Sequence, residues 1–441
     1  MKSSNSLFEQ EKIRKNGIRL LKLLCLMAEI IIVYYIAAFL IVDEGSTTRL
    51  AFHEFYEQSN IDMAVVGASK VYHGFNPELA DSLTGVNTFN MGTASQPVSV
   101  TYYYTKELLK NYRPDTLFVD VELAGLPRKI EGGKSTWLVY NHMKGFEKYK
   151  MAFAHGDFTT KLATVCSLYR SRENIDLEFI KNNVKAKSTE AYKKYLPESE
   201  FYTSYNIYQG KGFVTGSKVN EGYDLFCQYY GYDEFDEVES PDSQAMEYLD
   251  KIVAECKENN VRVVFISLPQ SRLYLSRVGD YDYFNKYITD YCNEKEVEYY
   301  DLNCVKSVIW QDGDFMDIDH LTLEGSEKLT HIISDIYNKE YPEMYNSIHD
   351  IPKQGIIGIM YSQEKIEGGD ILTFDVQVDD DTDVSSLKYV IKMLRDKNVV
   401  YESPILEENS ITLDRTDEKV MIEIYSKDGD YLYNARFQGI K

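Results

Sequence analysis

Residues 62–77 have the sequence "DMAVVGASKVYHGFNP". A short apolar run ends in Gly67-Ala68-Ser69 and is followed by a polar loop that contains His73. An apolar run that ends in small residues is typical of a buried parallel strand. Because ligands gather at the carboxyl ends of such strands, Ser69 stands where a nucleophile is expected. The same position also suits the N-cap of a helix, so both interpretations stay open at this point.

Apolar runs alternate with amphipathic stretches over much of the chain. We expect strands at 61–69, 86–92, 115–123, 261–269 and 297–303, and helices at 76–84, 98–112, 243–259, 281–294 and 322–339. Buried strands that alternate with amphipathic helices predict a parallel sheet covered on both faces. The expected fold class is therefore a three-layer α/β domain.

Two changes of pattern mark further parts of the chain. Residues 128–242 interrupt the alternation, begin with a mostly helical pattern, and indicate an insertion between the third and fourth strands. A long insertion at that place often shapes a substrate cleft. Residues 351–441 alternate with period two and carry turn signals, which predicts an antiparallel β-sandwich. The α/β domain is then expected to cover residues 43–345.

The segment 23–42, "LLCLMAEIIIVYYIAAFLIV", is apolar except for Glu29. About 20 apolar residues are enough to span a bilayer as a helix. Residues 1–22 are rich in Lys and Arg, whereas Asp43 and Glu44 follow the apolar segment. The positive-inside rule then predicts a cytoplasmic N-terminus and a single-pass anchor in the cell membrane, with the folded domains extracytoplasmic. A signal peptide is the alternative, but the following residues make a poor small-x-small cleavage site.

The composition excludes one class of function. The chain has 70 acidic and 48 basic residues, for a net charge of −22, and it lacks a basic stripe. Such a surface repels a phosphate backbone, so we expect no binding of nucleic acid. The six cysteines form neither a CxxC pair nor a Cys/His cluster with metal spacing, so we expect no metal site.

A second motif, "DFMDIDHLTLEGSEKL" at 314–329, supplies the groups that a nucleophilic serine needs. A serine hydroxyl needs a base to take its proton, and an imidazole base needs a carboxylate to orient it. Asp317 precedes His320 by three residues, so the two can meet on one turn. Asp319 is adjacent to His320 and is expected to point away from it. The sheet would have to bring Ser69 to this turn.

These motifs resemble three blocks of the SGNH/GDSL hydrolase superfamily. "GAS" at 67–69 resembles block one, "FNMGTAS" at 89–95 resembles block two, and the Asp-x-x-His pair resembles block five. The resemblance covers residues 61–128 and 243–340. It implies that Ser69 is the nucleophile, His320 the base and Asp317 the acid that orients the base.

The resemblance also implies an oxyanion hole that contains the backbone N–H groups of Ser69 and Gly92. The sequence departs from the family pattern in two places. The usual Gly-Asp-Ser is Gly-Ala-Ser here, and the asparagine of block three is absent from "FVDVELAGLP" at 118–127. Asn90 or Gln96 is a candidate for the missing oxyanion donor.

Four residues near the expected cleft are candidates for substrate contacts. They are His73 in the loop after Ser69, Gln96 after the second strand, Glu122 at the end of the third strand and Arg272 after the fourth. For each of them an ordinary structural or surface role is the alternative.

The order of the segments resembles a narrower group. A basic N-terminus, one span and an SGNH-like domain with "GASxxxxGFNP" and "DxDHL" are similar to membrane-anchored polysaccharide O-acetyltransferases and to the D-alanyl transfer protein of teichoic acid modification. The resemblance implies a serine acyltransferase or esterase that needs no cofactor and acts on a cell-surface glycan or a teichoic-acid-like polymer. It also implies a multi-pass membrane O-acyltransferase as a partner. The alternative is a non-catalytic scaffold or glycan-binding module that serves this partner.

Overall fold

The structure is a computed structural model. It describes residues 2–121, 123, 125–197, 206–216, 229–231, 240–317, 319–395, 398–413 and 419–437.

A five-stranded parallel sheet forms the centre of the first domain. Its strand order is β2-β1-β3-β7-β8, with β1 (Met63–Gly67), β2 (Thr88–Gly92), β3 (Thr116–Asp120), β7 (Arg262–Ser267) and β8 (Glu298–Asp301). Every residue of β1 and β2 is buried. The register pairs Gly67 with Gly92, so β1 and β2 end side by side. The predicted parallel sheet is confirmed, and each strand lies inside its predicted range.

Helices cover both faces of this sheet. One layer consists of α2 (Thr47–Glu57), α5 (Val98–Asn111), α12 (Ser243–Glu258) and α14 (Tyr281–Lys295), and the other of α3 (Ser69–Gly74), α4 (Pro77–Thr84) and α15 (Leu323–Tyr337). Because side chains of a strand alternate between its two faces, β1 contributes to both cores. Ala64 and Val66 pack in the first core, whereas Met63 and Val65 pack in the second. The three-layer architecture is therefore confirmed.

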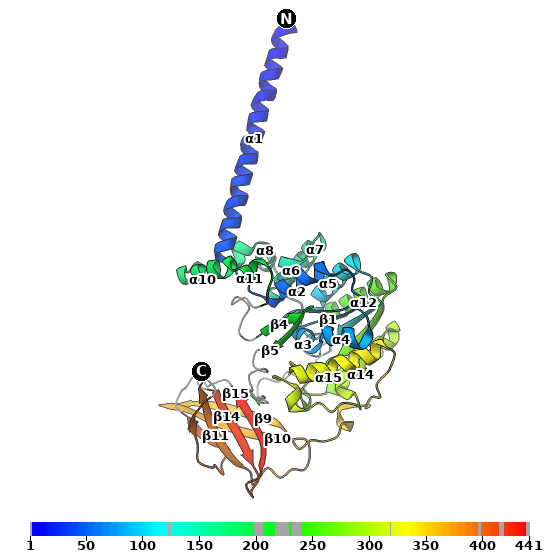
Figure 1. The fold of residues 1–441 in the computed structure, drawn as a ribbon, viewed down its shortest axis with the longest axis vertical. Coiled ribbons are helices and arrows are strands. Elements are labelled where there is room, and N and C mark those ends of the chain that lie inside the picture. The colour runs from blue at the N-terminus through cyan, green and yellow to red at the C-terminus, as the bar shows by residue number, and fades with distance from the viewer. Residues whose placement is uncertain are drawn as a thin grey trace.

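The segment between β3 and β7 contains helices and short strands. They are α6 (Lys134–His142), α7 (Glu147–Ala154), α8 (Phe158–Val165), α9 (Ser167–Arg170), α10 (Leu177–Ser188), α11 (Glu190–Lys193), β4 (Asn206–Gly210), β5 (Phe213–Gly216) and β6 (Tyr229–Gly231). Figure 1 shows the helices α6–α11 at the end of the domain from which the N-terminal helix leaves. The strands β4 and β5 form a hairpin that the sequence did not predict.

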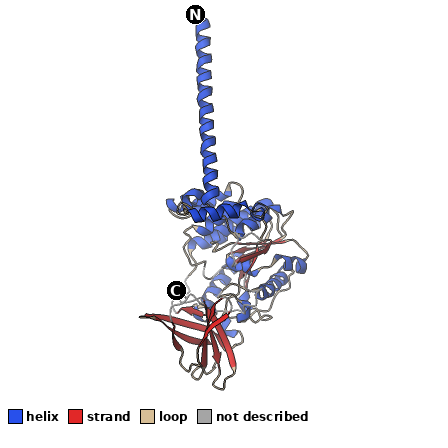
Figure 2. Cartoon of the chain, turned by 60° about the vertical axis from the view of Figure 1, so that its left-hand side comes forward, coloured by secondary structure: helices blue, strands red, loops and turns tan. Residues whose placement is uncertain are grey.

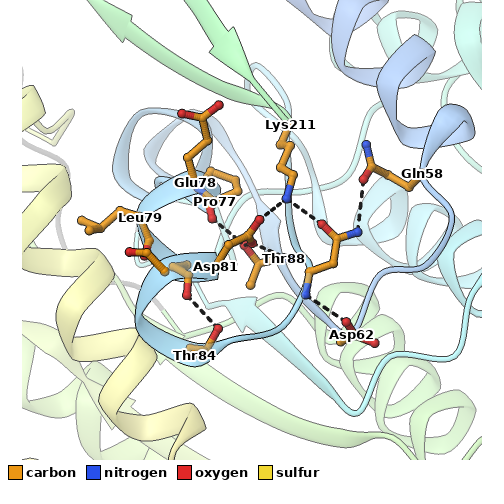
Figure 3. A network of polar contacts seen from close by, with 12 residues as sticks. Gln58, Asp62, Pro77, Glu78, Leu79, Asp81, Thr84, Thr88 and Lys211 are labelled. Carbon is orange, nitrogen blue, oxygen red and sulfur yellow. Dashed lines mark hydrogen bonds and ion pairs between the residues drawn. The ribbon is translucent and has the colours of Figure 1, made fainter.

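The tip of the β4–β5 hairpin is fastened to the α/β domain through Lys211 (Figure 3). Its Nζ pairs with Asp81 and donates to Asn87 Oδ1 at 2.6 Å. Gly212 follows with φ +86°, and a Cβ there would lie 1.9 Å from the carbonyl oxygen of Asn90. Only glycine combines this backbone conformation with so close an approach. The hairpin therefore packs directly on β2.

After β7 the chain forms α13 (Arg272–Arg277), and short 3₁₀ helices lie at Leu302–Cys304, Asp312–Asp314 and Ile348–Asp350.

Residues from 356 onward supply seven strands of two four-stranded sheets that pack on one core, and β6 supplies the eighth. The sheets have the orders β13-β10-β9-β6 and β12-β11-β14-β15. The new strands are β9 (Ile356–Ile366), β10 (Gly369–Val378), β11 (Lys388–Arg395), β12 (Asn398–Glu402), β13 (Ser410–Leu413), β14 (Lys419–Tyr425) and β15 (Tyr431–Phe437). Figure 2 shows this strand-rich unit beside the helix-rich domain. The predicted antiparallel sandwich is confirmed, and β6 of the insertion adds a parallel strand to its edge.

The N-terminal helix α1 (Lys2–Ile41) extends away from the rest of the chain (Figure 1). Its segment Arg14–Ile41 is long and apolar enough to cross a membrane. A signal sequence near the N-terminus has the same length and composition, so the helix is either an anchor or a signal sequence by this criterion.

Candidate active site

The fold brings Ser69, His320 and Asp317 into contact. Ser69 Oγ lies 2.7 Å from His320 Nε2, although the two residues are 251 positions apart. His320 Nδ1 lies 2.8 Å from Asp317 Oδ2 and 3.0 Å from Asp317 Oδ1. The expected hydrogen-bonded chain from a hydroxyl through an imidazole to a carboxylate is therefore present. These distances suit a neutral imidazole that donates Nδ1–H to Asp317 and accepts the Ser69 proton at Nε2.

The turn after β1 determines where Ser69 points. The strand ends at Gly67, and Ser69 is the first residue of α3. A Cβ on Gly67 would lie 2.7 Å from Asp120 Cβ and from Val71 Cγ2, so a larger residue would displace the turn. As the first residue of a helix, Ser69 has a backbone N–H without a carbonyl partner inside that helix.

The loop before α15 holds His320 by its backbone. Met316 N–H donates to His320 O at 2.7 Å, and Thr322 caps α15 by accepting from Gly325 N–H at 3.2 Å. The carboxylate of Asp317 accepts the backbone N–H groups of Asp319 and His320 at 3.1 and 2.9 Å. The residue that orients the imidazole ring therefore also closes the turn that carries it.

Two carboxylates, not one, face His320 Nδ1. Asp319 Oδ1 lies 3.2 Å from this nitrogen, so the prediction that Asp319 points away is wrong. The turn is tight enough for adjacent side chains to converge on one ring nitrogen. Partial burial raises the pKa of Asp317, but the hydrogen bond and charge of His320 and two backbone N–H groups outweigh it and lower the pKa to about 2. Asp317 is therefore ionised at neutral pH.

His73 is buried beside His320 and does not line an open cleft. The ring centroids of His73 and His320 lie 5.1 Å apart at 76°. His73 Nδ1 lies 2.8 Å from the carbonyl oxygen of Val214 in β5 and donates to it. Burial, and next the charge of His320, lower the pKa of His73 to about 3. We therefore correct its role from substrate contact to a neutral ring that joins the hairpin to His320.

Tyr72 is a neighbour of the site that the sequence did not indicate. Its ring lies 4.3 Å from that of His73 between centroids. Burial, and then the charges of Asp317 and Asp319, raise the pKa of Tyr72 to about 12. Its phenol therefore stays protonated beside the two carboxylates. An aromatic residue at the fourth position of a short helix carries no catalytic signal in the sequence.

The structure contradicts the oxyanion roles expected for Asn90 and Gly92. Asn90 Nδ2 donates to the carbonyl oxygens of Val71 and Phe75, both at 2.7 Å. Gly92 N–H donates to Asn90 Oδ1 at 2.9 Å. Asn90 thus ties β2 to α3, and its amide hydrogens are occupied. Of the predicted donors, the backbone N–H of Ser69 is the one that no bond within the described part of the chain occupies.

Two predicted substrate contacts are also occupied by internal bonds. Gln96 is buried, accepts from Thr93 Oγ1 at 2.7 Å and donates to Thr101 Oγ1 at 3.0 Å. Arg272 pairs with Asp379 at 2.9 Å, so it joins α13 to the sandwich. These two predictions are wrong because each side chain has a closer structural partner. Glu122 lies outside the described residues.

A small cavity lies beside the β4–β5 hairpin. Its volume is about 130 Å³, and its walls come from the β4–β5 hairpin, the start of α4 and the start of α15. The lining residues are Asn76, Glu78, Gln209, Gly210, Phe213, Thr215 and Leu323. The insertion therefore lines a cavity through its hairpin, and the role of this cavity as a substrate cleft stays a prediction. Its mixed polar and apolar walls suit a small polar group on an apolar stem.

The carboxylates and the histidine of the site are also residue types that bind metal ions. Asp317, Asp319 and His320 offer ligand atoms within 4.8 Å of one another. In the observed arrangement, however, the His320 nitrogens are committed to Ser69 and to the carboxylates. The geometry therefore describes a hydrogen-bonded serine–histidine–aspartate site.

Fold and site together define a three-layer α/β domain with a serine, a histidine and an aspartate at the carboxyl ends of its strands. One protein-family model matches residues 234–341, which is less than half of the chain. No curated protein matches the sequence.

Among solved structures, the chain is similar to GDSL-like lipolytic proteins. A protein of the G-D-S-L family from Desulfitobacterium hafniense DCB-2 shares 10% identity over 62% of this chain and 99% of that chain, with a TM-score of 0.28. An acylhydrolase from Bacteroides fragilis NCTC 9343 shares 12% over 67% and 98%, with a TM-score of 0.32. A GDSL-like lipase from Bacteroides thetaiotaomicron VPI-5482 shares 9% over 63% and 88%, with a TM-score of 0.29. These TM-scores are low, so the assignment of the site is based on the distances between its own residues.

Proposed function

We propose that this protein is an SGNH-type serine esterase or acyltransferase that removes or transfers acyl groups on a cell-surface polymer. One observation carries the proposal, namely the continuous contact from Ser69 Oγ through His320 to Asp317. Acyl transfer through a serine ester needs this arrangement of nucleophile, base and orienting acid. The alternative of a non-catalytic scaffold does not require it.

In the first half of the proposed reaction, Ser69 Oγ attacks the carbonyl carbon of an ester while His320 Nε2 takes the hydroxyl proton. Asp317 and Asp319 stabilise the imidazolium that forms at His320. The backbone N–H of Ser69 donates to the developing oxyanion. When the ester C–O bond breaks, His320 returns the proton to the leaving alkoxide, and the acyl group stays on Ser69.

In the second half, a hydroxyl group attacks the acyl-enzyme. His320 removes its proton, the bond between the acyl carbon and Ser69 Oγ breaks, and Ser69 is reprotonated. Water as the attacking group gives hydrolysis, whereas a sugar or polyol hydroxyl gives transfer. The cavity between the hairpin, α4 and α15 is the proposed place for that group, because Leu323 in its wall follows His320 by three residues and its lining is partly polar.

The proposed substrate class is an acylated cell-surface glycan or a teichoic-acid-like polymer. The apolar segment of α1 supports a membrane anchor, and its basic flank supports a cytoplasmic N-terminus. A domain anchored outside the membrane meets envelope polymers and partner proteins of the same membrane. A multi-pass membrane O-acyltransferase that supplies the acyl group is the proposed partner.

Pre-steady-state kinetics with an activated acetyl ester tests this function. The full chain in detergent should release a burst of about one equivalent of the alcohol per site, followed by slower turnover. Ser69→Ala should abolish the burst, whereas Ser59→Ala, a matched change of an exposed serine, should keep it. Added polyol should then shift the product from acetate to acetylated polyol if transfer dominates. A chain that gives no burst under any of these conditions would support the scaffold alternative.

A further inference from the structure

We infer that the helices α7–α10 of the insertion form a membrane-contact surface, which lies in the interface of the same bilayer that α1 crosses. Figures 1 and 2 show these helices across the end of the domain that faces α1. The inference rests on the membrane anchoring that is part of the proposed function, and it is independent of the proposed catalysis. Its occupant is lipid, specifically the headgroups and upper acyl chains around α1.

Only part of α1 stands free of the domain. Residues 14–33 of α1 are exposed, whereas Tyr34 is partly covered and Val42 is buried. Tyr34 Oη lies 3.0 Å from Ser167 Oγ of α9. At a rise of about 1.5 Å per residue, Tyr34 lies about 10 Å along the helix from Ile41. The short helix α9 therefore reaches about two turns up the side of α1.

This reach overlaps with the membrane-spanning part of α1. The basic residues of α1 end at Lys22, and from Leu23 to Val42 every residue except Glu29 is apolar. A hydrocarbon core about 30 Å thick needs about 20 residues of helix. A span that begins at Leu23 then ends near Val42, beyond the level at which α9 contacts Tyr34. Tyr34 lies about 12 Å inside that end of the span, so the helices beside α1 reach into the lipid and cannot stand clear of it.

The α7–α10 surface is rich in exposed apolar side chains. Outside α1, the four most exposed large hydrophobic side chains of the described residues all belong to it, namely Leu177, Phe158, Phe146 and Ile175. Leu177 is 86% exposed and Phe158 is 79% exposed. Phe153 of α7 is exposed as well. Clustered, exposed apolar residues on a soluble face mark an interaction site, and helices of this kind bury them in the headgroup boundary.

The α7–α10 surface is also basic. Residues 146–188 contain eight Lys and Arg and five Asp and Glu, a formal charge of +3 in a chain whose net charge is −22. Anionic lipids attract basic residues near the membrane surface, at about 1 kcal/mol for each. The acidic remainder of the chain is repelled by the same lipids, so the charge distribution orients the protein with α7–α10 toward the membrane.

Hydrogen bonds join the end of α1 to α10. Asn183 of α10 donates to the carbonyl oxygens of Leu40 and Val42 at 2.8 and 3.2 Å. Lys187 of α10 donates to Phe39 O at 3.2 Å and to Val42 O at 2.5 Å. These bonds satisfy the last carbonyls of α1, which a helix leaves unpaired at its end. The domain is thus held at a fixed angle to its own anchor, and the α7–α10 surface stays at the bilayer.

Quenching of introduced tryptophans by brominated lipids tests the inference. The full chain is reconstituted into vesicles of phosphatidylcholine and phosphatidylglycerol, with or without bromine on the acyl chains. Phe158→Trp and Leu177→Trp place the probe on the α7–α10 surface. Ile405→Trp is the matched control, because Ile405 is an exposed apolar residue of the sandwich. Trp137 and Trp310 are present in all three variants and give the same background.

We expect the added fluorescence of Phe158→Trp and Leu177→Trp to be quenched at least about twice as strongly as that of Ile405→Trp. If the quenching is no stronger than in the control while the chain resists extraction by alkaline carbonate, the inference is overturned. The α7–α10 surface would then bind a protein partner instead of lipid. Extraction of the chain by carbonate overturns the inference together with the anchoring. The ester-cleavage assay on the same vesicles reports separately on the proposed catalysis.

Discussion

The pair of carboxylates at His320 makes a specific prediction about catalysis. The kcat of ester hydrolysis should fall least in Asp319→Asn, more in Asp317→Asn and most in the double variant. Asparagine at position 317 can still accept the backbone N–H groups of Asp319 and His320, so the turn should be retained. The variants therefore remove the charge beside the imidazole and leave the fold of the loop intact.

The distances set the expected magnitudes. Asp317 offers oxygens at 2.8 and 3.0 Å from His320 Nδ1, and Asp319 offers one at 3.2 Å. A hydrogen bond to a charged group contributes about 1.5–3 kcal/mol, and about 1.4 kcal/mol corresponds to a tenfold change in rate. Asp317→Asn should then lower kcat about 10- to 100-fold, because Asp319 can still accept Nδ1–H. The double variant should approach the loss of about 10⁴-fold that follows removal of a lone orienting carboxylate.

Hydrolysis of an activated acetyl ester by the purified full chain measures these effects, with thermal unfolding as the control for folding. We expect Asp319→Asn alone to lower kcat by less than about tenfold. An Asp317→Asn variant with unchanged kcat would refute the role of Asp317. If this single variant were as impaired as the double variant, the second carboxylate would have no part in the reaction.

Three further predictions follow from the contacts around the site. The low pKa of His73, about 3 in the folded chain against 6.5, means that the unfolded chain binds the extra proton. Stability should therefore fall by about 1.4 kcal/mol per unit as the pH drops from 6.5 toward 3, and His73→Asn should flatten this slope in thermal unfolding. Arg272→Ala should cost about 1.5–3 kcal/mol in urea unfolding, because it leaves the largely covered Asp379 carboxylate without its cation, and Arg272→Lys should recover part of the loss. Gly92→Ala should lower both stability, by about 1–3 kcal/mol, and kcat, because its Cβ would lie 2.5 Å from Tyr72 N, whereas Gly313→Ala meets open space and should be neutral in both assays.

The parallel sheet and the contact between Ser69 and His320 could both be predicted from the sequence. Buried strands and amphipathic helices have distinct periods, and a parallel sheet gathers its strand ends at one edge. A hydroxyl after the first strand and an Asp-x-x-His turn before the last helix were therefore expected at the same edge. The three-residue spacing also indicated which carboxylate would close the turn.

The remaining parts of the site depend on contacts that local patterns do not encode. The β4–β5 hairpin touches His73 through Val214, which lies 141 residues away. Asn90 turns its amide toward α3, and Arg272 finds its partner in another domain, 107 residues later. In each case a polar residue near the site was expected to face the substrate. Each has an internal partner instead, because a buried polar group without one would destabilise the fold.

Mass spectrometry of the intact chain after treatment with a serine-directed fluorophosphonate shows whether Ser69 is an activated nucleophile. We predict one adduct per chain, mapped by peptide sequencing to Ser69, and absent from Ser69→Ala. His320→Ala should slow its formation at least about 100-fold, because the hydroxyl then loses its base. No adduct, or an adduct on another serine, would mean that Ser69 is not the nucleophile. Equal labelling of His320→Ala would mean that His320 is not its base.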